Sequence, residues 1–279
     1  MKLKKVNKLR KVVSLKNRIF AEDCFKTMQR FKDNEVSLIL TSPPYNTSRN
    51  TKTEKARENH WSRYDVFVDT GSHEEYIEWT AKLFNEFDRV LAENGVVLYN
   101  INYGTDGESA TCDNLIDTIH SISANTNFMV SDVIVWKKNS ALPNNTSPNK
   151  CTRIFEFIFV LCRKTEQKTY ISNKQIKSVS ARGQNFYTNM FNFIEAPNND
   201  GSCNLNKATY SSDLVLKLLE MYAGQKEGIV YDPFIGTGTT AVGVLRFNKD
   251  YDRNYYYVGS ELSEDQVKYA EDRIADYEN

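Results

Sequence analysis

Apolar and polar positions follow two rhythms along the chain, one typical of strands and one typical of helices. Over residues 72–91 apolar side chains recur at helical spacing, with Ser72 as a candidate N-cap and Asn94-Gly95 as a stop signal. Strands that alternate with helices favour an α/β fold, with a doubly wound, mostly parallel sheet and helices on both faces. Further helices are predicted over residues 115–122, 211–222, 239–247 and 263–277, and strands over 36–41, 96–101, 130–135, 155–161, 228–231 and 255–259.

Residues 164–206 interrupt this alternation. They are polar, rich in Asn, Lys, Ser and Gln, and carry isolated aromatic residues without a sustained period. We therefore expect a small irregular segment between two regular parts of the fold.

Composition narrows the range of functions. The 279 residues include 36 Lys and Arg against 36 Asp and Glu, so the formal net charge is zero and nucleic-acid binding requires local basic patches. No apolar run approaches the roughly 18 residues of a membrane-spanning helix, so no membrane association is expected. The basic residues 1–18 lack the apolar core of a secretory signal, and the five cysteines form no Cys-x-x-Cys pair. We expect a cytoplasmic protein without disulfides or a metal site.

A glycine-containing loop between a predicted strand and a predicted helix indicates a nucleotide site. Gly236 and Gly238 allow a sharp turn and a close approach of ligand to backbone. No lysine follows them, which disfavours a triphosphate-binding loop, and Gly243 is spaced wrongly for a dinucleotide motif. Glu261 ends the next strand, where a carboxylate accepts the hydroxyl hydrogens of a ribose. The candidate cofactor residues here are Asp232, Pro233, Phe234, Gly236, Thr237, Gly238, Thr239, Glu261 and Leu262.

A second candidate site follows the first predicted strand, in the sequence Thr41-Ser42-Pro43-Pro44-Tyr45. Two consecutive prolines fix the backbone, so the Ser42 hydroxyl and the Ser42 or Pro43 carbonyl point in set directions. Tyr45 adds a flat stacking surface. Acceptors beside an aromatic face suit the exocyclic amino group of a planar base. A rigid turn with a packed tyrosine is the structural alternative for the diproline taken alone.

Together, Ser42-Pro-Pro-Tyr45 and the Asp232-Pro-Phe-Ile-Gly-Thr-Gly-Thr-Thr240 loop resemble the paired motifs of the amino-methylating DNA methyltransferases. The catalytic motif comes first, as in the permuted β-type members. The resemblance implies a Rossmann-like methyltransferase sheet, S-adenosylmethionine as cofactor, and a catalytic motif formed by Ser42, Pro43, Pro44 and Tyr45.

The resemblance also extends to shorter segments. Glu22-Asp23-Cys24 is similar to the Gly-Asp-Cys segment of the family, and Asp23 is thereby implied to contact the cofactor adenine. Cys24 and Thr41 join the implied cofactor residues. Residues 207–210 lie where the family binds the methionine end of the cofactor. The usual sequence pattern of the family is degraded at this segment.

The implied function is site-specific methyl transfer from S-adenosylmethionine to an exocyclic amine of a base flipped out of double-stranded DNA. Serine at the first motif position most often accompanies N4 of cytosine in this family, so cytosine is the expected base and N6 of adenine the alternative. An RNA amino-methyltransferase and a catalytically silent nucleotide-binding module are further alternatives. A covalent cysteine route is disfavoured because no cysteine follows a proline, and all five cysteines are expected to be buried.

The same interpretation divides the chain into a catalytic half at residues 1–163, a target-recognition region at 164–206 and a cofactor-binding half at 207–279. Basic residues in three predicted loops are candidate phosphate contacts. A cognate restriction endonuclease and a second copy of the chain are open as protein partners. The candidate DNA contacts are Arg49, Lys52, Arg57 and Arg63 after the catalytic motif, Lys150 and Arg153 before the strand at 155–161, and Lys174 and Arg182 in the target-recognition region.

Overall fold

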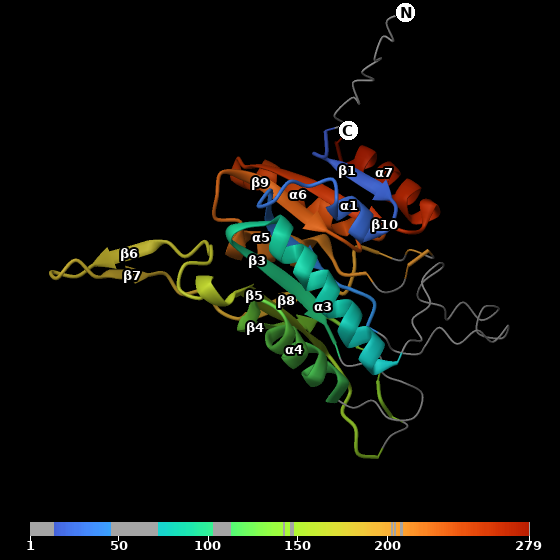
Figure 1. Cartoon of the computed structure of the whole chain (residues 1–279), viewed down its shortest axis with the longest axis horizontal. Helices are drawn as coiled ribbons and strands as arrows, with labels where there is room; N and C mark the ends of the chain where they lie inside the picture. The colour runs from blue at the N-terminus through green and yellow to red at the C-terminus, as the bar shows by residue number, and fades with distance from the viewer. Residues whose placement is uncertain are drawn as a thin grey trace, which may run out of the picture.

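The computed structural model describes most of the chain and shows one large sheet with helices on both faces (Figure 1). A separate two-stranded ribbon projects from this body (Figure 1). The candidate DNA contacts Arg49, Lys52, Arg57 and Arg63 lie outside the described residues. The described residues are 14–45, 72–102, 113–141, 143–145, 148–201, 203, 205–206 and 209–278.

The elements follow the predicted alternation of strands and helices. In spatial order the strands of the large sheet are β1 (Arg18–Ala21), β10 (Asn254–Glu261), β9 (Glu227–Asp232), β2 (Val36–Thr41), β3 (Leu91–Ile101), β5 (Phe155–Arg163), β4 (Phe128–Lys138) and β8 (Phe193–Ala196). The helices are α1 (Cys24–Met28), α3 (His73–Val90), α4 (Asp113–Asn125), α5 (Ser212–Tyr222), α6 (Thr239–Tyr251) and α7 (Glu264–Glu278), with a short 3-10 helix at Lys164–Glu166. The ribbon pairs β6 (Ile176–Val179) with β7 (Asn185–Tyr187).

The sheet is mostly parallel and changes direction at β5. β1, β10, β9, β2 and β3 run parallel, β5 is antiparallel to both of its neighbours, and β8 is parallel to β4. The chain leaves the adjacent strands β2 and β9 in opposite directions, toward β3 and toward β10. The carboxyl ends of β2 and β9 therefore form a topological switch point, where ligands bind in sheets of this kind.

The first long helix matches the prediction to within one residue at each end, but the strand after it begins earlier than predicted. Ser72 Oγ accepts from the Glu75 backbone N–H at 3.2 Å, and the Glu75 carboxylate accepts from the Ser72 N–H at 2.8 Å. β3 then begins at Leu91, although the predicted strand begins at residue 96. Its pairing with β2 skips from Leu91 to Val96, and Asn94 has a φ of 60°. The Asn94-Gly95 turn is thus an irregularity within the strand and does not stop the helix.

Two apolar cores lie on opposite faces of the sheet, because successive residues of a strand point to opposite sides. Leu38 and Val230 belong to the core formed with α5, α6 and α7. Their neighbours Ile39 and Tyr231 belong to the core formed with α1, α3 and α4. Among the helices that the structure describes, none has the length and apolar character needed to cross a membrane.

The segment 164–206 contains more regular structure than predicted. It includes the 3-10 helix, the projecting ribbon and β8, which extends the main sheet beside β4. The indole N–H of Trp136 on β4 donates to the carbonyl of Ala196 on β8 at 3.1 Å. Strands of three or four residues are too short to produce a detectable period, so the sequence pattern did not reveal them.

Candidate functional site

A cavity of about 270 Å³ opens among residues that follow the carboxyl ends of the parallel strands. Its volume is close to the lower limit of small-molecule sites, about 300 Å³. The Ser42 motif and the Gly236 loop, which are far apart in the sequence, both line it. The predicted site residues that line the cavity are Asp23, Cys24, Ser42, Pro44, Tyr45, Pro233, Phe234, Gly236, Thr237, Thr239, Glu261 and Leu262.

Four predicted site residues do not line the cavity: Thr41, Pro43, Asp232 and Gly238. Thr41, Pro43 and Asp232 are buried. The Thr41 hydroxyl donates to Asp232 Oδ1 at 2.8 Å, and the backbone N–H of Phe234 donates to the same oxygen at 3.0 Å. These bonds tie the end of β2 to the end of β9.

The second oxygen of Asp232 is also occupied. Tyr210 donates to Oδ2 at 2.9 Å and Thr240 donates to it at 2.5 Å. Burial raises the pKa of Asp232, and the hydrogen bonds from its four donors oppose that rise. Asp232 therefore acts as a buried anchor for the catalytic strand, the glycine loop and the start of α6.

The glycine loop folds around the carboxylate of Glu261. Glu261 accepts from the backbone N–H of Gly236 at 3.2 Å and from that of Ser263 at 2.9 Å. Gly236 has a φ of 52° and Gly238 a φ of 80°, conformations that side chains disfavour. A Cβ at Gly238 would also lie 2.8 Å from Cβ of Ala270 on α7. Burial raises the pKa of Glu261, and the backbone donors partly offset that rise.

An aromatic wall closes one side of the cavity. The rings of Trp79 and Phe234 lie 5.7 Å apart, and Tyr76 stacks on Trp79 at 5.8 Å. The Tyr76 hydroxyl donates to the Pro44 carbonyl at 2.7 Å, which holds the diproline against α3. Trp79 lines the cavity, but the sequence did not single it out because it has the spacing of an ordinary core position.

The residues after β1 contribute a carboxylate and a thiol. Asp23 lines the cavity while its Oδ1 accepts from the Phe25 N–H at 2.8 Å and caps α1. Burial raises the pKa of Cys24 to about 12, so its thiol is neutral and a poor nucleophile. The prediction that all cysteines are buried is wrong for Cys151, which is exposed, and for Cys203, which is half-buried. Both lie in connections outside the cores.

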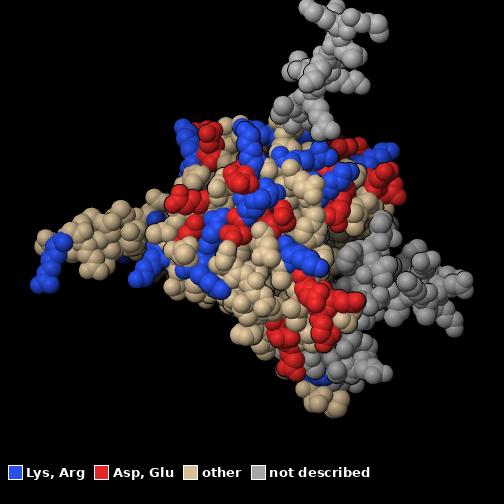
Figure 2. Space-filling view, in the orientation of Figure 1, with Lys and Arg blue, Asp and Glu red and all other residues tan. Residues whose placement is uncertain are grey.

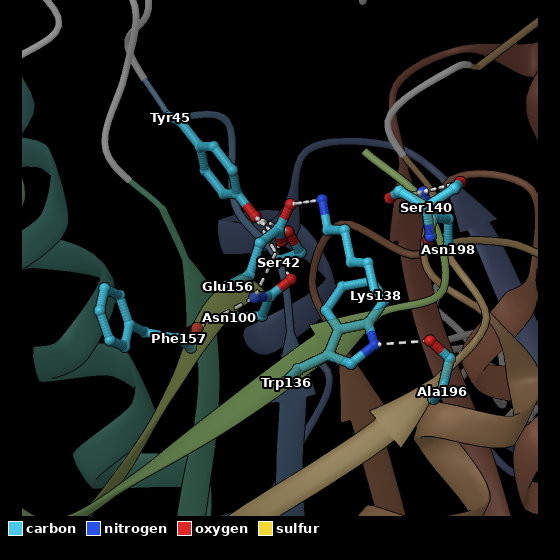
Figure 3. Close-up of polar contacts among 10 residues, drawn as sticks. All are labelled: Ser42, Tyr45, Asn100, Trp136, Lys138, Ser140, Glu156, Phe157, Ala196 and Asn198. Carbon is cyan, nitrogen blue, oxygen red and sulfur yellow. Dashed lines mark hydrogen bonds and ion pairs between the residues drawn. The ribbon is translucent and has the colours of Figure 1, made fainter. Parts of the chain in front are cut away.

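Polar side chains from three strands gather beside the catalytic motif (Figure 3). Ser42 Oγ lies 2.8 Å from the Tyr45 hydroxyl, which in turn donates to Asn100 Oδ1 at 3.3 Å and to Glu156 Oε2 at 3.5 Å. Lys138 forms an ion pair with Glu156. All five residues line the cavity.

Sequence reasoning missed three of these five residues: Asn100, Lys138 and Glu156. Glu156 carries a signal that could have found it, because it is the one charged residue in the apolar run at 155–161. Asn100 likewise is a polar residue near the carboxyl end of a parallel strand. Other cavity-lining residues outside the predicted set are Glu22, Trp79, Trp136, Asn198, Asn199, Asn206, Thr209, Tyr210, Ile235, Ser260 and Gln266.

The candidate DNA contacts that the structure describes are not among the residues that line the cavity. Lys150 is exposed and Arg153 is half-buried, both on the connection between β4 and β5. Lys174 and Arg182 are exposed, the first before the ribbon and the second in the turn between its strands. Within the described ranges, no three His, Cys, Asp or Glu side chains are grouped to hold a metal ion.

Comparison with known sequences matches this chain to a family of DNA-modifying enzymes. The family model for N6- and N4-methyltransferases, described as DNA methylase, matches residues 36–272. The orphan methyltransferase M.BamHII of Bacillus amyloliquefaciens is 26% identical over 273 residues, covering 88% of this chain and 91% of that protein. The type II methyltransferase M.MthZI of Methanothermobacter thermautotrophicus is 27% identical over 247 residues, covering 77% and 66%.

Solved structures share the fold at low sequence identity. The cytosine-N4-specific PvuII DNA methyltransferase superposes with a TM-score of 0.67 at 13% identity, covering 94% of this chain and 91% of that one. The Thermus thermophilus protein TTHA0409, solved in complex with S-adenosyl-L-methionine, gives a TM-score of 0.59 at 17% identity and covers 94% of each chain.

The buried anchor role of Asp232 predicts a large effect on stability. Asp232→Ala leaves four donors without their acceptor, and we expect the free energy of unfolding to fall by roughly 2–4 kcal/mol in urea denaturation. The matched control is Asp33→Ala, which removes an exposed carboxylate paired with Arg89 and is expected to change stability by less than about 1 kcal/mol. Equally small losses in both variants would contradict the anchor role.

Proposed function

Since the chain belongs to the DNA methylase family of N6- and N4-methyltransferases, we propose that it methylates N4 of cytosine in double-stranded DNA. The enzyme is an S-adenosylmethionine-dependent DNA amino-methyltransferase. The observation that carries the proposal is that the Ser42 motif and the Glu261 carboxylate line one shared cavity. A methyl donor held near Glu261 and a base held at Ser42 can therefore meet.

S-adenosylmethionine supplies a methyl group on a sulfonium, which is an activated donor. The residues on the glycine-loop side of the cavity suit it: Glu261 offers a carboxylate to ribose hydroxyls, and Phe234 offers an apolar ring face. A side chain at Gly236 would fill part of the cradle, since its Cβ would lie 3.0 Å from Asn206 Nδ2. Asp23 is proposed to accept from the adenine amino group.

The catalytic motif suits an exocyclic amine. Tyr45 offers its ring for stacking of the extruded base, and Ser42 offers its hydroxyl and carbonyl oxygens to the amine hydrogens. Accepting these hydrogens turns the nitrogen lone pair out of conjugation with the ring and toward the methyl group that a bound cofactor would present. As the N–C bond formed, the C–S bond would break and leave a neutral thioether, and the methylated amine would release one proton to its acceptors or to water. Holding both reactants in one cavity supplies much of the rate.

The preference for cytosine over adenine depends on Ser42. Its hydroxyl is neutral, and in this family serine at that position most often accompanies cytosine. N6 of adenine is the alternative, because both amines present two N–H donors to the same acceptors.

The test is methyl transfer from labelled S-adenosylmethionine to duplex DNA, followed by nucleoside analysis. We expect N4-methylcytosine as the product of the natural chain. Ser42→Ala should lower the single-turnover rate by roughly 100-fold or more, because an acceptor aimed at the reacting amine is lost. Its dissociation constant for S-adenosylmethionine should change less than about twofold. N6-methyladenine as the product would show that the target base is adenine. Equal weakening of the methyl-transfer rate and of cofactor affinity in Ser42→Ala would refute the catalytic role of Ser42.

Glu261→Ala is expected to act on binding. It should raise the dissociation constant for S-adenosylmethionine roughly 10- to 100-fold, the scale of a hydrogen bond to a charged group. Because burial raises the pKa of Glu261, its carboxylate is lost on acidification at a higher pH than for an exposed glutamate. Calorimetry should therefore show affinity falling as the pH drops through that raised pKa, and the variant should lack this dependence. Unchanged affinity in the variant would remove Glu261 from the site.

The projecting ribbon is proposed as a DNA-binding arm. Residues 167–194 contain Lys168, Lys174, Lys177 and Arg182 but no Asp or Glu. On the face shown in Figure 2 the arm carries Lys and Arg and no acidic residue. A two-stranded ribbon fits the major groove of DNA, and basic side chains along it suit the flanking phosphates.

Removing two of these charges tests the arm. The Lys174→Ala/Arg182→Ala double variant should bind duplex DNA more weakly and reduce the slope of log affinity against log salt by about 2, one counterion per lost contact. S-adenosylmethionine affinity should stay constant. Lys249→Ala, which removes an exposed charge on α6, is the control. A variant slope equal to that of the natural chain would exclude these two residues as phosphate contacts.

Protein partners are a further part of the proposal. Relatives named type II methyltransferases support a cognate restriction endonuclease, whereas the relative named an orphan methyltransferase supports a solitary role. A homodimer is the second proposed assembly, and light scattering distinguishes it from a monomer.

A further inference from the structure

A continuous series of polar contacts leads from the catalytic serine to a carboxylate on another strand (Figure 3). Ser42 Oγ and the Tyr45 hydroxyl lie 2.8 Å apart, and either could be the donor from distance alone. The Tyr45 hydroxyl also reaches Asn100 Oδ1 at 3.3 Å and Glu156 Oε2 at 3.5 Å. The partners beyond Tyr45 decide which way these hydrogen bonds run.

Both of those partners can only accept. The Asn100 amide nitrogen donates to the Phe157 carbonyl at 3.0 Å and to Glu156 Oε2 at 3.3 Å, so its oxygen faces Tyr45. Glu156 is the partner of the Lys138 ammonium, and a carboxylate accepts through both oxygens. Tyr45 has one hydroxyl hydrogen, which these acceptors take. The oxygen of Tyr45 is then left to accept from Ser42.

The direction of this series matters at the reacting atom. When the Ser42 hydrogen points to Tyr45, the lone pairs of Ser42 Oγ are free to accept a hydrogen from an amine in the cavity. When the series is reversed, one lone pair of Ser42 Oγ accepts from Tyr45, and the Ser42 hydrogen is released to rotate into the cavity, where it opposes the N–H donors of the amine. Ser42 is therefore the better acceptor in the first arrangement, which keeps both lone pairs available and the hydrogen away from the cavity.

We propose that Glu156 is a positioning residue that sets this direction, because it accepts from Tyr45 and also holds the Asn100 amide with its oxygen toward Tyr45, and that it thereby makes Ser42 an acceptor. The inference rests on the proposed function, because it assumes that Ser42 accepts from the target amine. Lys138 holds Glu156 in place, and its ammonium also lies 5.2 Å from the ring centroid of Trp136. Glu156 acts through Tyr45 and needs no contact of its own with the base.

Glu156→Gln reverses the critical contact. Lys138 retains the amide oxygen of the new side chain, so its NH₂ group takes the place of Oε2. That NH₂ group faces both Tyr45 and the Asn100 amide nitrogen as a donor, so neither acceptor of the Tyr45 hydrogen keeps its arrangement. We expect the single-turnover rate of methyl transfer to fall roughly 10- to 100-fold, the scale of a hydrogen bond to a charged group. Dissociation constants for S-adenosylmethionine and duplex DNA should change less than about threefold. A general disturbance of the site would weaken binding as well as the rate.

Tyr45→Phe supplies the second variant. It keeps the stacking ring and removes the hydroxyl that links Ser42 to Glu156, so its rate should fall to a similar extent. In the Tyr45→Phe background, Glu156→Gln should cause no further loss, because the contact through which it acts is already absent. This non-additivity separates a positioning role from an independent structural role.

A neighbouring ion pair provides the matched control. Lys137 pairs with Glu195, one position along β4 from Lys138, and both side chains are about half exposed and outside the cavity lining. Glu195→Gln therefore removes the same charge from a neighbouring, more exposed pair, and the rate should be unchanged.

The outcomes separate the inference from the function on which it rests. If the natural chain transfers no methyl group to duplex DNA, the proposed function fails. If the natural chain is active and either Glu156→Gln or Tyr45→Phe retains its full rate, the positioning role is overturned while the function stands. Rate losses that multiply in the double variant also overturn it, and thermal unfolding of each variant verifies that the comparison is between folded proteins.

Discussion

The hydrogen bond between Thr41 and Asp232 joins two parts of the chain that are 191 residues apart. It lies between the ends of β2 and β9, the adjacent strands from which the chain departs in opposite directions. Ser42 follows one partner and Pro233 follows the other, so a single buried contact fixes the catalytic motif beside the glycine loop. Tyr210 and Thr240 occupy the second oxygen of Asp232 and make the contact part of a larger network.

The direction of the strands brings the remaining chemistry to the same edge of the sheet. The parallel strands end there, which places Glu261 and Asn100 at the cavity. β5 runs the other way and begins there, so Glu156 near its start meets Lys138 at the end of β4. The two sides of the cavity therefore offer different groups. The side around Gly236 has a carboxylate and backbone N–H groups, and the side around Ser42 has a series of hydrogen-bonded side chains.

Periodicity and local signals predicted much of this architecture, including α3 with its Ser72 cap and the strands before both motifs. The direction of β5 and the contact between Lys138 and Glu156 were not predictable, because the hydrophobic pattern of a buried strand does not record which neighbours it joins. Asp232 was expected at the cofactor, yet its four donors are recognisable only once Thr41, Tyr210 and Thr240 are folded around it. Trp79 has the spacing of a core residue and lines the cavity as well.

The central claim is that one cavity holds donor and acceptor side by side. Its most direct test is a crystal structure of the chain with duplex DNA and a non-transferable analogue of S-adenosylmethionine. We predict an extruded base stacked on Tyr45, with its amine about 3–3.5 Å from the position of the donor methyl and hydrogen-bonded to Ser42. An analogue bound away from the Gly236 loop, or a base amine out of reach of Ser42, would contradict this claim.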